Sequence, residues 1–397
     1  MNSWRSGGLA DLGTETRAML IGVTLLNVVA LAGPLVLPLF NESLQRSLHL
    51  SAAEIGEVTA LGMVSAVLSN LLTKYWVRRF SWPAAARVLL IGLIVADLLW
   101  FVCERRWIPL LAVQCLIGFL SGSLYSLTLA VIGDGRHPDR MFGIIMAAQV
   151  TFQVIGLLAG PLILRHGAID LLIAIFALLN AASLLLTGVL PARGRSLAKT
   201  VPFASLMKLP IVLGLAGCVF FMLNVGAYWT YVELIGQHAG LGEADVSNSL
   251  AAGVCVGLLG GLAASWGAGR FNRNALLTVG ALMTVGSVWL LFPPLNVGQF
   301  AISCGIYNFA WNLSLALNYS AINATDSTGH VLPVTPAFHS IGATAGPGIA
   351  ALLVGPYGYD CVIWLAAGGA VLSVGCFWAS SAVLRTGVAT SGNQEVR

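Results

Sequence analysis

Long apolar runs separated by short polar connectors make up nearly the whole chain. Twelve of these runs have about the 20 residues that a helix needs to cross the hydrocarbon core of a bilayer. Gly, Pro and charged residues, which favour loops, lie between them. The pattern predicts twelve membrane-spanning helices, at 17–40, 54–76, 84–103, 107–132, 141–165, 169–190, 210–236, 246–267, 274–293, 298–323, 331–355 and 360–384.

A ten-residue segment occurs twice within these runs, 186 residues apart. It reads F-Q-V-I-G-L-L-A-G-P at 152–161 and F-H-S-I-G-A-T-A-G-P at 338–347. Self-similarity at a spacing close to half the chain indicates a duplicated unit, in which this segment belongs to the fifth of six helices. We expect an all-α membrane protein with two pseudo-symmetric six-helix bundles, at 1–190 and 210–397, joined by a cytoplasmic central loop at 191–209.

The two copies share a pair of glycines four residues apart, followed by a proline. Glycines at this spacing lie on one helix face, where they let another helix approach closely in lipid. The proline removes a backbone hydrogen bond and softens the helix. The alternative is a packing motif with no role in movement. The candidate gating or packing residues are Gly156, Gly160, Pro161, Gly342, Gly346 and Pro347.

Composition supports a polytopic membrane protein and excludes several other classes. Charged residues make up 9% of the chain, against about a quarter in soluble domains. The net charge of +4 indicates no nucleic-acid partner, because the basic residues lie in loops. The seven scattered cysteines lack metal-ligand spacing, and no phosphate-binding G-x-x-x-x-G-K-[ST] loop occurs. We therefore expect no metal, no cofactor and no ATP hydrolysis.

The distribution of the 20 Lys and Arg residues predicts the orientation. With the N-terminus inside, sixteen of them fall on the cytoplasmic side and four on the outer side, as the positive-inside rule requires. Both termini are then cytoplasmic. The first apolar run is too long for a signal peptide and lacks a cleavage site. We expect an integral protein of a prokaryotic inner membrane, and a monomer.

The G-x-x-x-G-P of the fifth helix and the connector after the second helix both resemble motifs of the major facilitator superfamily. The connector reads S-N-L-L-T-K-Y-W-V-R-R at 69–79, with Thr73 where the family usually has Asp. The resemblance implies two parallel six-helix bundles and a substrate site near mid-membrane, with alternating access by rocking. It also implies that helices 1, 4, 7 and 10 line the site. Within the family, the fifth-helix motif is most frequent in proton-driven exporters.

Polar and aromatic residues gather on one face of each of these four helices. Amides and rings on the wall of a cavity suit hydrogen bonding and stacking with a small organic molecule. The alternative is that they join neighbouring helices, as Asn often does in membranes. The substrate-binding candidates are Asn27, Gln114, Tyr125, Asn224, Tyr228, Asn308, Trp311, Asn312 and Tyr319.

Few ionisable residues lie within the predicted spans, where they are functional candidates by default. His339 and Glu57 are the proton-coupling candidates, since a His titrates near neutral pH; a structural role for either stays open. Asp97 lies in helix 3, and we expect it to make a local polar contact. No Lys or Arg lies deep in a predicted cavity helix, which argues against a multiply charged anion as substrate.

These observations predict a secondary transporter of a small, neutral or weakly charged organic solute, with protons and the lipid bilayer as further partners. Proton-coupled efflux is the first hypothesis. A proton symporter or facilitator importing a neutral nutrient, such as a sugar or an aromatic compound, is the alternative. A membrane enzyme would need a reactive cluster, and the sequence shows none, so we expect no enzymatic activity. A sensor would normally carry a soluble output domain, and no polar segment is long enough for one.

Overall fold

The computed structural model describes residues 14–50, 52–166, 168–193, 208–326 and 328–392, and within these ranges it is helical without strands. The helices follow one another as expected for two groups of six spans. Their bounds are α1 Thr14–Ala30, α2 Ala32–Leu35, α3 Leu37–Leu48, α4 Ala52–Trp76, α5 Trp82–Cys103, α6 Trp107–Gly133, α7 Pro138–His166, α8 Ala168–Ser183, η2 Leu184–Val189, α10 Leu209–His238, α11 Glu243–Gly267, α12 Arg273–Trp289, α13 Val297–Thr325, η3 Leu332–Val334, α14 Thr335–Tyr357 and α15 Asp360–Gly392.

Within the described ranges, nine helices are long and apolar enough to cross a membrane. The other three expected spans correspond to α1 with α2 and α3, to α4, and to the 17-residue α12. The prediction of an all-α fold of the twelve-helix type is confirmed. Most of the expected central loop lies in 194–207, outside the described residues.

The first span differs from the expected single helix at 17–40, because the structure breaks it into α1, α2 and α3. Gly33 and Pro34 lie in the four-residue α2, and Pro38 lies in the first turn of α3. A proline inside a helix removes one backbone hydrogen bond and clashes with the preceding turn. Two prolines four residues apart account for the breaks at Leu31 and Val36.

Smaller differences occur at other helix ends. The expected sixth span at 169–190 ends in the 3₁₀ helix η2, and the eleventh begins with the 3₁₀ helix η3. The ninth ends at Trp289, before the expected residue 293, since Pro293 and Pro294 follow and cannot continue it. None of these differences changes the order of the spans.

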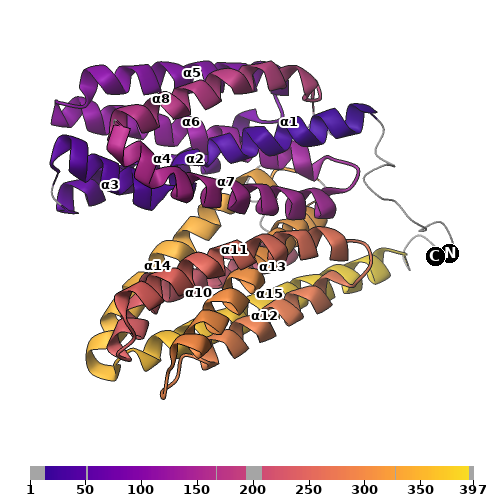
Figure 1. The fold of residues 1–397 in the computed structure, drawn as a ribbon. Helices are drawn as coiled ribbons and strands as arrows, with labels where there is room; N and C mark the ends of the chain where they lie inside the picture. The colour runs from indigo at the N-terminus through magenta and orange to yellow at the C-terminus, as the bar shows by residue number, and fades with distance from the viewer. Residues whose placement is uncertain (1–13, 51, 167, 194–207, 327, 393–397) are drawn as a thin grey trace.

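The helices form two bundles, α1 to η2 and α10 to α15, which lie one above the other in Figure 1. They meet where α7 lies against α11 and α13, and where α4 lies against α14. The bundles are close at the end that carries Arg78, Arg136 and Arg273, which we call the basic end. They spread apart towards the opposite end (Figure 1).

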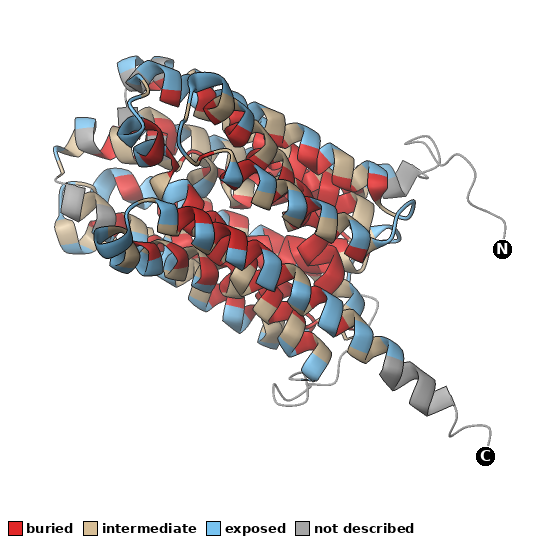
Figure 2. Ribbon diagram, turned by 90° about the horizontal axis from the view of Figure 1, so that it is seen from below, coloured by how far each residue is buried: buried red, intermediate tan, exposed pale blue. Residues whose placement is uncertain are grey.

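Burial separates the inside of the molecule from its lipid-facing outside. Figure 2 shows buried residues along the helix faces that look towards the other helices, and exposed ones on the outer faces. Large apolar side chains such as Leu158, Leu185 and Leu352 are among the most exposed. Exposed apolar surface of this extent is what a bilayer, and not water, accommodates.

Candidate functional site

A cavity of about 1040 Å³ lies between the two bundles. Its walls come from the broken first span, α4, α6, α10, α13 and α14, with further residues from α5, α7 and α8. The family resemblance implies that helices 1, 4, 7 and 10 line the site. These helices correspond to α1–α3, α6, α10 and α13, and all four contribute residues to the lining. The lining is mainly apolar, with a small number of polar side chains, as in typical small-molecule sites.

A chain of three polar side chains crosses the cavity between the bundles. Tyr125 on α6 and Tyr319 on α13 have their hydroxyl oxygens 2.7 Å apart. His339 on α14 lies with Nδ1 3.2 Å from the Tyr319 hydroxyl. All three are buried and line the cavity. The sequence prediction placed each of them at the site separately, and the structure brings them into one hydrogen-bonded chain.

Two tryptophans form an aromatic wall beside this chain. Trp311 on α13 and Trp229 on α10 both line the cavity, with ring centroids 5.6 Å apart. The indole Nε1 of Trp311 and the Nε2 of His339 are buried and have no hydrogen-bond partner within the described protein. Unpaired buried polar atoms are costly, so a polar group that reached either atom would stabilise it.

The first bundle contributes amides to the opposite wall. Gln114 on α6 and Gln149 on α7 line the cavity. Gln149 Nε2 donates to Asn27 Oδ1 at 2.7 Å, and Asn27 Nδ2 donates to Thr128 Oγ1 at 2.8 Å. Asn27 is fully buried behind Gln149. It therefore positions a lining amide and does not itself line the cavity.

Four further candidates lie between helices, outside the lining. Asn224 accepts a 2.7 Å hydrogen bond from Tyr307, whose ring stacks on Tyr228 at 3.5 Å. Asn308 and Asn312 donate to backbone carbonyls of their own helix. The shared face expected for α13 is thus divided, because Trp311 and Tyr319 point to the cavity while the two amides do not line it.

The remaining candidates have separate surroundings. Glu57 is exposed near the start of α4 and does not line the cavity. Pro347 lies inside α14 and lines the cavity. A Cβ on Gly346 would lie 2.2 Å from Leu223 O of α10. The glycine pair of each copy faces a helix of its own bundle. Gly342 and Gly346 face α10. Gly156 and Gly160 face Val36 and Leu39, and Pro161 follows this pair in α7.

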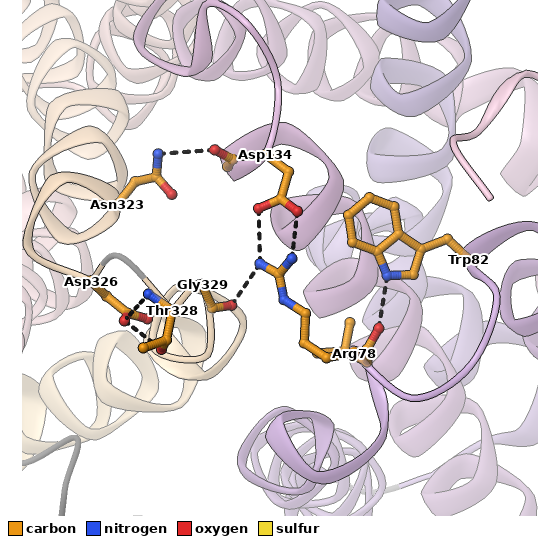
Figure 3. A network of polar contacts seen from close by, with 9 residues as sticks. Arg78, Trp82, Asp134, Asn323, Asp326, Thr328 and Gly329 are labelled. Carbon is orange, nitrogen blue, oxygen red and sulfur yellow. Dashed lines mark hydrogen bonds and ion pairs between the residues drawn. The ribbon is translucent and has the colours of Figure 1, made fainter. Parts of the chain in front are cut away.

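An arginine joins the bundles at the basic end (Figure 3). Arg78 follows α4 and forms an ion pair with Asp134 at the end of α6, in which Nη2 donates to Oδ1 at 2.9 Å. The same Nη2 donates to Gly329 O of the second bundle at 3.0 Å. Burial and the Arg78 charge lower the pKa of the adjacent His330, and Asp326 opposes them. This network closes the basic end.

Further contacts strengthen the closure. Arg273 Nη2 donates to Asp139 Oδ2 at 3.0 Å across the bundles, and Asn323 Nδ2 donates to Gly133 O at 3.1 Å. A Cβ on Gly143 of α7 would lie 2.3 Å from Ser265 N of α11. Among the described residues, the hydrogen bonds between the bundles lie at the level of the tyrosine pair or nearer the basic end, so the cavity is closed on that side.

Sequence reasoning missed Gln149, Trp229, Asp134 and Asp139. Gln149 and Trp229 are polar or aromatic residues within predicted spans, so the signal was present. The two acids lie in the connector between the predicted helices 107–132 and 141–165, beside Arg136 and Arg140. Their pairing with Arg78 and Arg273 depends on tertiary contacts 56 and 134 residues away along the chain. Within the described residues, no group of three His, Cys, Asp or Glu is placed to hold a metal ion.

Comparison with known proteins identifies the family. A family model described as Major Facilitator Superfamily matches residues 20–332. The chain belongs to this superfamily. It is 23% identical over 263 residues to an uncharacterized MFS-type transporter, YcaD, of Escherichia fergusonii. That match covers 61% of this chain, and the chain spans 65% of the length of this curated relative.

Solved structures show the same fold. A crystal structure of the Major Facilitator Superfamily transporter FucP in the outward conformation matches with a TM-score of 0.75 and 13% identity, covering 91% of this chain and 98% of that one. A structure of the proton:xylose symporter XylE matches with a TM-score of 0.72 and 15% identity, covering 91% and 95%. At these identities the likeness establishes the fold of the superfamily.

Proposed function

We propose that the protein is a secondary active transporter that moves a small, neutral or weakly charged organic solute by alternating access, coupled to protons and directed outwards. The observation that carries this proposal is the cavity between the bundles, closed at the basic end by Arg78 and Arg273. A site enclosed from one side at mid-membrane is the intermediate that alternating access requires.

The lining supports the class of solute. No Lys or Arg lines the cavity among the described residues, and the aromatic wall of Trp229 and Trp311 offers apolar contact. Trp311 Nε1 is a hydrogen-bond donor without a partner. The proposed ligand is therefore an organic molecule with an apolar body, and a hydrogen-bond acceptor on it would satisfy the Trp311 donor.

His339 is the proposed coupling residue between the bundles, because it ends the hydrogen-bonded chain from Tyr125 through Tyr319. Protonation of its ring would change which of the three groups donates. The exposed Glu57 is the second candidate. Efflux rests on the resemblance of the fifth-helix motif to that of exporters. The proposed setting is a prokaryotic inner membrane, with the basic end and both termini in the cytoplasm and the protein as a monomer.

The first experiment identifies the ligand by its stabilisation of the purified protein, since a bound ligand raises the apparent stability. Trp311→Ala should weaken binding of a stabilising compound by about 1–3 kcal/mol, or roughly five- to a hundred-fold. Asn312→Ala is the matched control on the same helix, and it should bind normally. Equal binding by both variants and the wild type would place the site outside this cavity.

Transport of that compound then tests direction and coupling. Inside-out vesicles with an imposed pH gradient should accumulate it if the protein is an exporter, whereas accumulation only in right-side-out vesicles would favour the importing alternative. His339→Gln should keep exchange across the membrane and lose accumulation driven by the gradient. Normal gradient-driven accumulation by His339→Gln would move the coupling role to another residue.

A further inference from the structure

The cavity has a side branch that reaches between α5 and α8 of the first bundle. Its lining there includes Leu93 and Asp97 of α5, and Phe176 and Asn180 of α8. Asp97 is buried, with 2% of its surface exposed. Among the described lining residues it is the only carboxylate, and none is a cation. A carboxyl group buried without a cation is costly when ionised, which makes it a candidate for binding a proton.

Asn180 is suited to both forms of this carboxyl group. Its Nδ2 donates to Asp97 Oδ2 at 2.9 Å, which satisfies the ionised form. Asn180 is 5% exposed, and its Oδ1 is buried without a hydrogen-bond partner. A protonated Asp97 can donate to that oxygen after the amide rotates. One side chain therefore offers a donor to the carboxylate and an unused acceptor to the acid.

The same face of α5 continues towards the end opposite the basic end. Asp97, Trp100 and Glu104 are at i, i+3 and i+7, which places them on one face, with about 10 Å between the first and the last. Trp100 is fully buried and its Nε1 has no partner. Glu104 Oε2 is also buried without a partner. Unpaired polar atoms in a row are the sites at which buried water is held.

A second acidic group lies at the outer end of this row. Burial raises the pKa of Glu104, the neighbouring Asp170 carboxyl at the start of α8 raises it further, and Arg105 lowers it. Asp170 is exposed, and two neighbouring carboxyl groups favour a proton on one of them. Glu104 is therefore a group that can bind a proton next to the solvent.

We propose that Asp97 and Asn180 form a proton-binding site of the first bundle, reached from the outer end along the α5–α8 seam through the Glu104–Asp170 pair. A proton bound at Glu104 moves to the ionised Asp97, which leaves Glu104 ionised and gives Asp97 an O–H group that donates to Asn180 Oδ1. This inference rests on the proposed proton coupling. It adds a carboxyl site away from His339, which lies between the bundles.

No other titratable group interferes with this assignment in the described residues. The elements packed on α5 are α6, α8 and η2. Their charged or titratable side chains, with those of α5 and of the cavity, are Arg87, Cys103, Cys115, Tyr125, Asp170, Tyr319 and His339. Asn180 is the one described side chain that hydrogen-bonds Asp97, and Arg87 donates instead to Thr187 at 3.0 Å.

The test measures protonation directly, by infrared spectroscopy of the full-length protein in lipid nanodiscs as the pH is raised. The wild type should show a protonated-carboxyl C=O band that titrates away, and Asp97→Asn should lack this band. Glu42→Gln is the matched control, because Glu42 is an exposed acid paired with Arg46. An unchanged band in Asp97→Asn would overturn the proposal.

Two further variants keep the test decisive if Asp97→Asn does not fold. Asn180→Leu should move the midpoint of the band to higher pH, because the ionised carboxyl loses its hydrogen-bond donor. Glu104→Gln should leave the band in place and slow its appearance in a rapid pH jump applied from the outer end of the protein in liposomes. A band with the wild-type midpoint in Asn180→Leu, or wild-type kinetics in Glu104→Gln, would contradict the site or the route respectively.

These results are distinguishable from failure of the proposed function, because the infrared test needs no solute. If the wild type transports its solute without any response to a pH gradient, the proposed coupling is wrong even when the Asp97 band is present. If gradient-driven transport exists and Asp97→Asn retains it in full, the proposed role of Asp97 is wrong and the proposed function stands.

Discussion

The two copies of the duplicated segment pack in different ways. In the second bundle, a Cβ on Gly342 or Gly346 would lie 2.1 or 2.2 Å from a backbone oxygen of α10. In the first bundle, the corresponding positions meet side chains: a Cβ on Gly156 would lie 2.4 Å from Val36 Cγ1, and one on Gly160 would lie 3.3 Å from Leu39 Cδ1.

The partner helix explains this difference. In the second bundle α10 runs unbroken over 30 residues, whereas in the first bundle the counterpart is divided into α1, α2 and α3. A continuous helix presents a regular backbone surface, and a second helix can approach that surface closely through small residues such as glycine. A broken helix presents side chains that can adjust. The same sequence motif therefore builds a rigid contact in one bundle and a deformable contact in the other.

Replacing the second glycine of each copy with alanine should give the largest effect among the tests of this comparison. Gly346→Ala should lower the free energy of unfolding by about 1–3 kcal/mol, because the added methyl meets Leu223 O and Ala227 N, which are backbone atoms and cannot turn away. Gly160→Ala meets only the flexible end of Leu39, and its change should stay below about 1 kcal/mol. Thermal unfolding of the two purified variants measures the difference, and equal shifts in Tm would show that the copies are equally rigid.

A test with an effect of intermediate size concerns how the closure of the basic end depends on pH. Burial and Arg78 lower the pKa of His330 in the closed form, with Asp326 opposing them, and opening would release His330 towards its ordinary value of 6.5. The closed form therefore binds this proton less tightly. Closure is favoured above that ordinary value and weakens as the pH falls through it.

Spin labels at Arg136→Cys and Arg270→Cys, in a variant with the native cysteines replaced by serine, measure the separation of the bundles at the basic end. The population with a long distance should grow at acidic pH in this background. His330→Gln should flatten that dependence. The same pH response with and without His330 would assign the effect to another group.

The smallest expected effect comes from Gly33, which lies where the first span is broken into α1, α2 and α3. Gly33→Ala should stabilise the protein by about 0.4–1 kcal/mol, since alanine restricts the unfolded chain and a Cβ at Gly33 meets nothing within 4 Å. Gly286→Ala in α12 is the matched control, as a Cβ there also meets nothing within 4 Å. Both should stabilise alike, and only Gly33→Ala should slow transport. Identical transport by the two variants would show that the break has no role in movement.

The order and number of the helices could be predicted from sequence because each span must satisfy its own backbone in lipid, which makes long apolar runs a strong signal. The break in the first span was missed, although Pro34 and Pro38 were visible. Prolines are common in membrane helices and many of them only bend the helix. Whether a helix bends or divides depends on the neighbours that satisfy the freed backbone groups, and sequence does not show those neighbours.

Only part of the candidate site could be predicted from the sequence, for a similar reason. Periodicity placed Trp311 and Tyr319 on one face of α13, and both line the cavity. It placed Asn308 and Asn312 on that face too, yet the structure turns them to carbonyls of their own helix. One side of α13 thus includes both a part of the cavity wall and a part of the contact with α11, and Asn308 and Asn312 lie against Gly257 of α11. Asp97 was expected to make a local polar contact, and it accepts a hydrogen bond from Asn180. Sequence could not show that the cavity also reaches Asp97, because that follows from the packing of α5 and α8.

The crossing of α7 and α11 has a mechanical consequence. Gly143 and Gly261 hold these helices in backbone contact, while the counterpart pair, α4 and α14, touches over fewer residues. Under the proposed alternating access, the bundles would turn about the tighter contact between α7 and α11. Residues of α14, such as His339 and Pro347, would then move further than residues of α7.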